Sequence, residues 1–491
     1  MDEIFNQLCD LIKKNKVRII DFKVTDLTGV WHHLSIPVER LIKNILVPSS
    51  YSKDILEKGI GFDGSSYGFL SVEKSDMVFI PDAKSAFLNP IPDIPTVSMI
   101  GDIYKIGSNG LERFADDPRF IAEKAELFLS ETGISDKCLF GPEFEFYILD
   151  NIEFAVEKNH IGVYLDSEQA EWNACNSMYA KPGGNQGYKV LAHKGYHADL
   201  PYDASFNLRN KMALILEENG IPVKYHHSEN GGPGQVELEI EFSTLRDISD
   251  RTQKLKYLVK NTAVQNGKTV TFMPKPFFGE AGSGMHVHLH MFKKGKPLFF
   301  DKNGYSALSE KALFAIGGIL KHSAALMAFT NPSANSYKRL VPGYEAPVSI
   351  CFAEANRSAV IRIPAYAKEP ENKRFEFRPS DATANPYLCF SAILMAAIDG
   401  ILNKIDPTAE GFGPWDKNMY HLTEKEKKHV KTLPKSLDEA ADAVGKDHAF
   451  LLAGSVFTES IINSQIKKLK RDVEEISQIP HPVEFKKYFD L

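Results

Sequence analysis

The spacing of apolar residues changes along this chain of 491 residues, and the change separates helices from strands. Within residues 1 to about 15, Ile4, Leu8 and Leu11 recur at helical intervals, which predicts a short amphipathic helix. From residue 17 the pattern becomes strand-like, with runs at residues 18–25 and 30–36 separated by a turn signal. We therefore expect a small α+β domain over about residues 1–112.

The remaining residues, 113–491, mix short strands with amphipathic helices and contain no second boundary. Helices are predicted at residues 119–130, 436–444 and 458–475, the first of them behind a pair of acidic residues. Two glycine-rich segments, at residues 183–187 and 230–234, match neither the Walker nor the dinucleotide-binding pattern. The sequence predicts an α+β chain with one small and one large domain.

Four strand segments carry their ionisable residues with period two. In a strand, residues i and i+2 point to the same side. The intervening residues are apolar, so each strand is fixed on a core and its charged face meets solvent or a shared cleft. The residues on these faces are Glu143 and Glu145; Glu237, Glu239 and Glu241; His286, His288 and His290; and Arg374, Glu376 and Arg378.

Any one of these strands alone is typical of a solvated sheet face with cross-strand ion pairs. Four together favour a shared cleft, because a solvated face would carry more Lys, Thr and Ser. Carboxylates packed together repel, and divalent cations relieve that repulsion. Oxygen ligands with few imidazoles suit Mg²⁺ or Mn²⁺, and arginines suit phosphate or carboxylate groups. The pattern predicts phosphoryl transfer by positioning and charge neutralisation.

Further arginines follow in two segments. Residues 335–347 carry Arg339 and then a loop, bounded by proline and glycine, that holds Glu345. Residues 356–362 supply Arg357 and Arg362. A single arginine is typical of a surface salt bridge, whereas several near one acidic cleft favour binding of an anionic substrate.

Composition narrows the class of protein. The chain is 43% hydrophobic and 25% charged with a formal net charge of -6, so nothing predicts a nucleic-acid partner. No segment approaches about 20 uninterrupted apolar residues, so we expect no membrane span. The five cysteines are scattered and form no CxxC pair. A cytoplasmic enzyme is expected.

Several segments together resemble type I glutamine synthetases. They are residues 62–66, 141–146, 275–286, 335–346, 356–358 and 385–387, in that family's order. The resemblance implies a β-grasp-like N-terminal domain and a catalytic domain with a funnel of curved antiparallel strands. It also implies a dodecamer of two six-membered rings with active sites between subunits. The implied reaction joins glutamate and ammonium, with ATP consumed through a γ-glutamyl phosphate intermediate.

Position by position, the resemblance implies which residues bind metal and ATP. One site for Mg²⁺ or Mn²⁺ would use Glu145, Glu229 and Glu237, and a second would use Glu143, His286 and Glu376. The phosphates and the nucleotide would be held by Arg357, Arg362, Arg374, Tyr196 and His288.

The other implied roles concern glutamate, ammonium and regulation. Gly282, Arg339 and Arg378 would bind glutamate. Asp63, Ser66 and Glu345 would form the ammonium site, with Asp63 accepting a proton from ammonium and the Glu345 loop closing over the intermediate. Arg357 and these two carboxylates would be catalytic. Tyr420 resembles a tyrosine that is adenylylated in one subgroup of the family.

Three positions depart from the usual family pattern. Lys224 and His290 replace a glutamate and a serine near the nucleotide, and Ala281 replaces an asparagine beside the glutamate pocket. The alternatives are a γ-glutamyl ligase for amines or polyamines, a two-metal phosphohydrolase and an inactive homologue. Asp63 favours ammonium over amines, and the six metal-ligand positions argue against an inactive protein. A phosphohydrolase would leave Asp63 and Glu345 unexplained.

Overall fold

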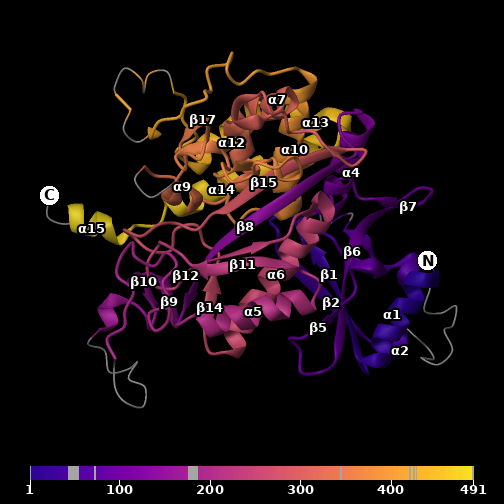
Figure 1. Ribbon diagram of the computed structural model, residues 1–491. Helices are drawn as coiled ribbons and strands as arrows, with labels where there is room; N and C mark the ends of the chain where they lie inside the picture. The colour runs from indigo at the N-terminus through magenta and orange to yellow at the C-terminus, as the bar shows by residue number, and fades with distance from the viewer. Residues whose placement is uncertain are drawn as a thin grey trace.

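The computed structural model describes residues 2–41, 55–70, 73, 75–174, 186–342, 346–419, 422, 423, 426, 428 and 430–488. Within these ranges the strands form a seven-stranded, a ten-stranded and a two-stranded sheet. The seven-stranded sheet belongs to the N-terminal part of the chain, drawn in indigo and purple in Figure 1.

The N-terminal sheet confirms the predicted small α+β unit. Its order is β2-β1-β6-β4-β3, with β5 and β7 also paired to β6. The predicted amphipathic helix packs on this sheet, because Phe5, Leu8 and Ile12 join the same buried cluster as Phe22 and Phe79. The elements are α1 (Asp2–Lys14), β1 (Ile19–Thr25), β2 (Trp31–Pro37), α2 (Val38–Leu41), β3 (Ile60–Asp63), β4 (Asp76–Pro81), β5 (Phe87–Asn89), β6 (Thr96–Gly107) and β7 (Gly110–Arg113).

The ten-stranded sheet carries the four predicted charged faces, although Glu241, Arg374 and Arg378 lie just beyond the ends of their strands. Its order is β11-β12-β8-β15-β19-β18-β17, with β13 and β14 paired to β8 and β16 paired to β15. The pairing is antiparallel except between β17 and β18, which are parallel, a departure from the expected antiparallel funnel. The strands are β8 (Lys137–Leu149), β11 (Val223–Ser228), β12 (Gln235–Ile240), β13 (Ser243–Thr244), β14 (Thr269–Thr271), β15 (Met285–Lys293), β16 (Lys296–Pro297), β17 (Ser349–Glu354), β18 (Ala359–Ile363) and β19 (Phe375–Phe377).

Helices cover the apolar side of this sheet. The predicted apolar residues Phe144, Leu238 and Phe375 lie in one core cluster with residues of the surrounding helices. The almost wholly buried α10 packs against both α7 and α4. The helices are α4 (Pro118–Glu131), α5 (Phe206–Glu218), α6 (Leu245–Gln265), α7 (Glu310–Lys321), α8 (Ser323–Thr330), α9 (Ser336–Arg339), α10 (Pro386–Leu402), α12 (Leu437–Lys446), α13 (Ala449–Leu452), α14 (Glu459–Ser477) and α15 (Pro482–Tyr488).

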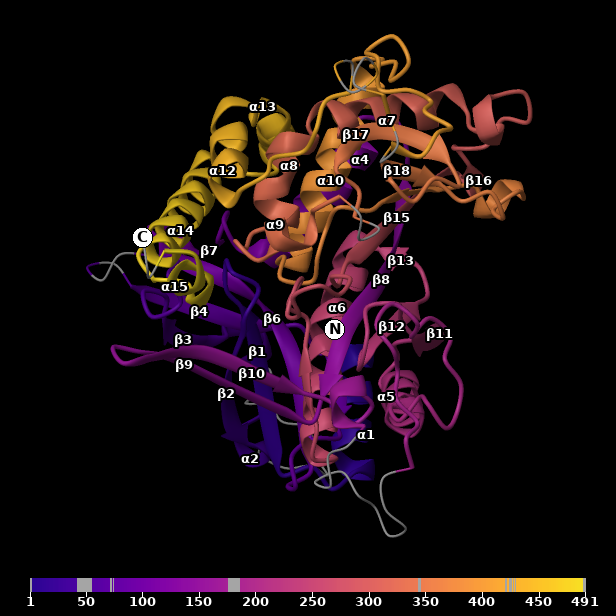
Figure 2. The ribbon, with the colours of Figure 1, turned by 90° about the vertical axis from the view of Figure 1, so that its left-hand side faces the viewer.

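A hairpin extends from the part of the molecule that follows the N-terminal sheet. It consists of β9 (Asn151–Glu157) and β10 (His160–Asp166), which form the two-stranded sheet and project as a long ribbon in Figure 2. Phe154 and Val163 are 77% and 65% exposed on it. The C-terminal α15 also leaves Phe485 exposed. Both segments present apolar side chains to solvent in the single chain.

An ionic cluster joins the N-terminal sheet to the helices α4 and α6 of the larger part of the molecule. The buried guanidinium of Arg119, on α4, donates to Asp82 and Asp102 beside and within the N-terminal strands, at 2.8 Å each. It also donates to Asp250 of α6 at 3.0 and 2.8 Å. One arginine therefore connects residues from three separate parts of the chain.

No single helix among the described residues is long and apolar enough to cross a membrane. The pair α7 and α8 passes that test on length and composition only when taken together, and it is bent by 74°.

A buried histidine connects the C-terminal helices to the core. The ring nitrogens of His322, between α7 and α8, lie 3.0 Å from Asp399 of α10 and 2.8 Å from Asp447. Phe450 of α13 stacks on the ring at 4.1 Å between centroids. Burial acts to lower the pKa of His322, but hydrogen bonds to the two carboxylates outweigh it, so the pKa is raised.

Replacing His322 with glutamine is expected to lower the melting temperature at pH 6 by about 2–4 °C. The imidazolium is the form that both carboxylates bind, so its stabilisation is full below about pH 6.5, the pKa of an unfolded histidine. It is lost as pH rises through the higher folded pKa. Thermal melts from pH 5.5 to 8.5 should show the two proteins converging, with exposed His160→Gln as the control. A difference independent of pH would contradict this role.

Candidate active site

The order of the central strands brings residues from all four predicted charged faces into one cleft. Strand β12 pairs with β8, β8 with β15, and β15 with β19. The registers place Glu237 opposite Glu145 and His286 opposite Glu143. Their side chains therefore project from adjacent strands on the same side, as the period-two pattern predicts for strands that share a face.

One cluster unites all three residues of the second implied metal site. The ligand atoms of Glu143, His286 and Glu376 lie within 4.8 Å of one another. His286 Nδ1 is 3.1 Å from Glu143 Oε2 and 3.5 Å from Glu376 Oε1. Two carboxylates and one imidazole, all buried, form a donor set that fits Mg²⁺ or Mn²⁺.

A second cluster contains two of the three residues of the other implied metal site. Glu229 and Glu237 group with His227, with ligand atoms within 4.8 Å of one another. Glu145 is opposite Glu237 in the register but is not part of this cluster; its Oε2 accepts a hydrogen bond of 2.5 Å from the Gly284 N–H. The structure thus adds His227, which the sequence did not single out.

The carboxylates of this second cluster are crowded. Burial, followed by the charges of Glu145 and Glu237, raises the pKa of Glu229 to about 8. Burial and the charges of Glu143 and Glu145 raise the pKa of Glu237 well above its ordinary value. Mutual repulsion of this kind is what a bound divalent cation would relieve. The oxygen-rich donor set with one imidazole again fits Mg²⁺ or Mn²⁺.

Arginines surround Glu376 on the opposite side of the cleft. Arg362 Nη1 donates to Glu376 Oε2 at 2.6 Å, and Arg378 Nε donates to Oε1 at 3.0 Å. Burial and the Glu143 charge act to raise the pKa of Glu376, but Arg378 and the neighbouring histidines outweigh them and lower it. Glu376 is therefore held as a carboxylate between two cations and the histidines.

The implied glutamate pocket is built around Arg339. Its Nη1 donates to the Pro379 carbonyl at 2.6 Å, and its Nη2 lies 3.3 Å from His286 Nε2. A Cβ on Gly282 would come within 2.6 Å of the Arg339 side chain and 2.4 Å of the Pro274 carbonyl. Glycine at this position leaves the arginine room beside the cleft.

These side chains enclose a pocket of about 210 Å³. Of the residues implied by the resemblance, those lining it are Glu143, Glu145, Glu229, Glu237, His286, Glu376, Gly282, Arg339, Arg378, Tyr196, Arg357 and Arg362. His288 and Arg374 are buried nearby but do not line it.

Asp63 and Ser66, the implied ammonium-site residues of the N-terminal part, lie outside this pocket in the single chain. Asp63, at the end of β3, is exposed and does not line the pocket, and the same holds for Ser66. The Ser66 hydroxyl donates to Asp63 Oδ2 at 2.6 Å, and the Ser65 hydroxyl donates to Oδ1 at 2.7 Å. These hydrogen bonds, Ser66 first, lower the pKa of Asp63 to about 2. The carboxylate is thus held in its charged form.

Two implied residues, Glu345 and Tyr420, lie outside the described residues, although Ala346 lines the pocket. The three residues that depart from the family pattern, Lys224, Ala281 and His290, are all described by the structure. Ala281 lines the pocket, and Lys224 pairs with Glu239. His290 is buried against Phe292 at 4.1 Å between ring centroids. Burial and then Arg374 lower the pKa of His290 to about 4.

Comparison with known proteins identifies the family. The profile of the glutamine synthetase catalytic domain matches residues 115–488, and that of the glutamine synthetase beta-Grasp domain matches residues 16–106. The chain is 44% identical over 486 residues to the glutamine synthetase of Aquifex aeolicus, covering 99% of this chain and 98% of that one.

Solved structures agree with this assignment. A cryo-electron microscopy structure of Plasmodium falciparum glutamine synthetase matches with a TM-score of 0.85 and 27% identity, over 99% of this chain and 98% of that one. A structure titled GmaS/ADP complex is more distant, with a TM-score of 0.78 and 25% identity over 99% of both chains. The charged cleft, the two profile matches and the full-length similarity show that this chain belongs to the glutamine synthetase family and is a glutamate–ammonia ligase that makes glutamine with ATP.

Proposed function

We propose that the cleft between β12, β8, β15 and β19 binds the substrates and two divalent cations, and that glutamine forms there through γ-glutamyl phosphate. The observation that carries this proposal is the convergence of two carboxylate–histidine clusters and several arginines on one pocket. Glu143, His286 and Glu376 would hold one ion. Glu145, Glu229 and Glu237 would hold the other, with His227 as a further donor. The ions would neutralise charge on the phosphates of ATP.

The chain's own residues would orient the two substrates. Arg339 and Arg378, beside Gly282, would pair with the carboxylates of glutamate. Arg357, Arg362 and Arg374 would pair with the phosphates and the transferred group. Tyr196 and His288 would lie near the nucleotide. Guanidinium groups suit both tasks, because their planar fork forms two parallel hydrogen bonds with carboxylate or phosphate.

The ammonium site would consist of Asp63, Ser66 and Glu345. Asp63 suits a cation, because its hydrogen bonds with Ser65 and Ser66 keep it ionised. Ammonium has no lone pair until it loses a proton, and Asp63 would take that proton as attack on the acyl phosphate begins. The Glu345 loop would exclude water, which would otherwise hydrolyse the intermediate.

We infer that the working enzyme is a dodecamer, as the family resemblance implies. Two features support an oligomer. Asp63 and Ser66 do not line the pocket of their own chain, so a neighbouring subunit can complete the site. The hairpin β9–β10 and α15 also expose large apolar residues such as Phe154 and Phe485, which are typical of surfaces buried between subunits.

Other parts of the proposal concern organisation, regulation and location. We propose that the chain consists of two domains, residues 1–112 and residues 113–491. We also propose that Tyr420 is the residue that is adenylylated. We propose the cytoplasm as the enzyme's location. Cys9, Cys138, Cys351 and Cys389 are buried free thiols, which fits a reducing compartment.

A substrate panel tests the proposed function. Purified protein with ATP, Mg²⁺ and glutamate is expected to form product with ammonium and to give at most a few per cent of that rate with methylamine, ethanolamine or a polyamine. The reason is that Asp63 offers a carboxylate to a small cation that must lose a proton. Mass spectrometry identifies each product, and phosphate release gives its rate. A higher rate with an amine than with ammonium would reverse the assignment in favour of a γ-glutamyl-amine ligase.

A further inference from the structure

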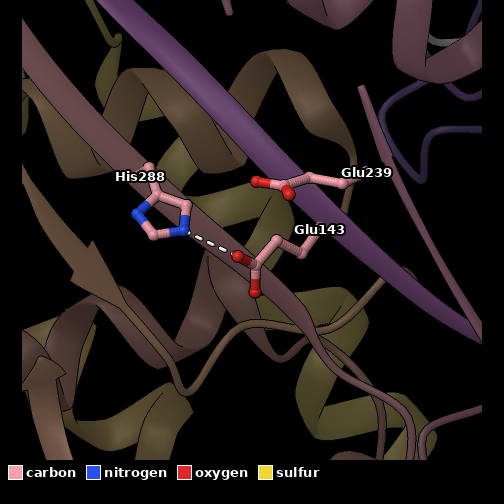
Figure 3. A group of neighbouring side chains, drawn as sticks. All are labelled: Glu143, Glu239 and His288. Atoms are coloured by element: carbon pink, nitrogen blue, oxygen red, sulfur yellow. Dashed lines mark hydrogen bonds and ion pairs between the residues drawn. The ribbon is translucent and has the colours of Figure 1, made fainter. Parts of the chain in front are cut away.

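Arg357 is held at the cleft differently from the buried side chains of the sheet. Figure 3 shows Glu143, Glu239 and His288 converging from the paired strands β8, β12 and β15, so the sheet itself fixes them. Arg357 also lines the pocket, but it is exposed and lies in the connection between β17 and β18, outside any strand. Ala355, in the same connection, has a φ of 55°, which residues other than glycine rarely adopt. The connection therefore needs contacts from elsewhere in the chain to hold it.

The side-chain amide of Asn356 supplies such contacts, because it joins this connection to a distant part of the chain. Its Nδ2 donates to the carbonyl of Trp415 at 3.1 Å and to the carbonyl of Lys417 at 2.6 Å. Its Oδ1 accepts from the Ser358 N–H at 3.0 Å and from the Ser358 hydroxyl at 2.6 Å. The reverse orientation of the amide would set its oxygen against two carbonyls, so these partners fix its orientation. Arg357 is thus enclosed between two residues that one amide holds together.

The segment 415–419 that Asn356 contacts is itself anchored on β17 and β18. The Trp415 N–H donates to the carbonyl of Phe352, in β17, at 3.0 Å. At the other end of the segment, the Met419 N–H donates to Ser358 Oγ at 3.1 Å. The Met419 side chain is 5% exposed and packs in a small buried cluster with residues of both strands. The segment is therefore a fixed support against which the connection is held.

Arg357 lies between the pocket and a neighbouring groove. The residues that line this groove with Arg357 include Asp416, Lys417 and Asn418, which belong to the segment 415–419. Asn356 lines the groove but not the pocket, so it lies behind Arg357 as seen from the proposed substrates. A change in how the segment meets Asn356 would therefore reach the pocket through Arg357.

We propose that Asn356 is a positioning residue for Arg357, and that the segment 415–419, through this amide, sets where the guanidinium lies in the cleft. The inference rests on the proposed function, in which Arg357 pairs with the phosphates and the transferred group. Stabilisation of a transferring phosphoryl group depends on the placement of the charges around it. A displacement of about 1 Å, caused by a change far from the chemistry, can cost about 100-fold in rate.

The first test changes the donor of this amide in the complete enzyme. Asn356→Asp keeps the oxygen that Ser358 bonds but sets a second oxygen against the two carbonyls, whereas Asn356→Ala removes the donor without adding charge. In both variants kcat for glutamine formation is expected to fall by about 10–100-fold, with glutamate-dependent phosphate release falling equally. The matched control is Asn109→Asp, which is exposed and is expected to retain the wild-type kcat. A normal kcat in both Asn356 variants, or a loss confined to Asn356→Asp, would overturn the proposal.

The second test separates positioning from a general structural role by combining variants. In an Arg357→Ala background, Asn356→Ala is expected to lower kcat by less than about twofold further, because the group that Asn356 positions is already gone. Glutamine formed from radiolabelled glutamate makes these slow rates measurable. A full additional loss in the double variant would overturn the proposal, since Asn356 would then act by another route.

Ser358→Ala keeps the inference testable if the Asn356 variants fail to fold. It removes the oxygen that accepts from the Met419 N–H and is expected to lower kcat several-fold in the wild-type background but not in Arg357→Ala. Equal losses in the two backgrounds would again overturn the proposal. Normal glutamine formation by Arg357→Ala itself would instead refute the role of Arg357 in the proposed function, so the two failures are distinguishable.

Discussion

Glutamine formation is expected to fall by about 10²–10³-fold when Glu376 is replaced with glutamine. Glu376 lies in one metal-ligand cluster and also pairs with Arg362 at 2.6 Å and Arg378 at 3.0 Å. The neutral amide would be a poor ligand for a divalent cation. It would also leave the buried guanidinium of Arg378 and the partly buried one of Arg362 without their counter-charge, so they would no longer be held in the positions proposed for glutamate and phosphate.

The measurement is the steady-state rate of glutamine formation over a range of Mg²⁺ and Mn²⁺ concentrations. The variant should need more metal as well as being slower, because it loses a ligand. Glu371→Gln is the control, since Glu371 is exposed five residues earlier in the chain. Wild-type enzyme in excess chelator should be inactive until metal is restored. Full activity in chelator, or a normal rate for Glu376→Gln, would remove this cluster from catalysis.

Replacing Asp63 with alanine is expected to separate the two chemical steps. Glutamine formation should fall by about 10²–10⁴-fold, the usual contribution of a positioned base. Phosphoryl transfer should continue, because neither the metal clusters nor the arginines of the pocket include Asp63. The acyl phosphate would then pass to water, so glutamate-dependent phosphate release should exceed glutamine formation.

The assay follows glutamine and phosphate release together at saturating ATP, with exposed Asp93→Ala as the matched control. Equal loss of both products in Asp63→Ala would show that Asp63 has a structural role. Near-normal glutamine formation would remove it from the ammonium site. A raised KM for ammonium with little change in kcat would indicate that Asp63 binds the cation without taking its proton.

The charged faces could be predicted from the sequence, because successive side chains of a strand point to opposite sides. Where every second residue is apolar and buried, the residues between them share the other face. Phe144 and Phe375 are fully buried, and the ionisable residues between such positions gather on the other side, as expected. The order of the strands was not predictable, because pairing depends on contacts between distant segments. The parallel pairing of β17 with β18 is one result that a local pattern could not reveal.

His227 and Glu239 show where the local pattern is insufficient. Strand β11, which carries His227, has the sequence Val-Lys-Tyr-His-His-Ser and no regular apolar face, so nothing distinguished His227 from a surface residue. Glu239 shares the face of Glu237, yet it is fully buried and pairs with Lys224 of the neighbouring strand. Charge pairing across a sheet becomes visible only when the register is known.

The ion pairs of Arg119 make the two proposed domains depend on each other, so one cannot be exchanged freely for that of a relative. Its guanidinium belongs to the chain after residue 112, but two of its three carboxylate partners, Asp82 and Asp102, precede that position. A fragment that ended near residue 112 would leave these aspartates without their shared cation, and the remaining fragment would expose a guanidinium that is normally buried. Grafting the N-terminal unit of a relative onto this catalytic unit would therefore require all of these charges to be transferred together.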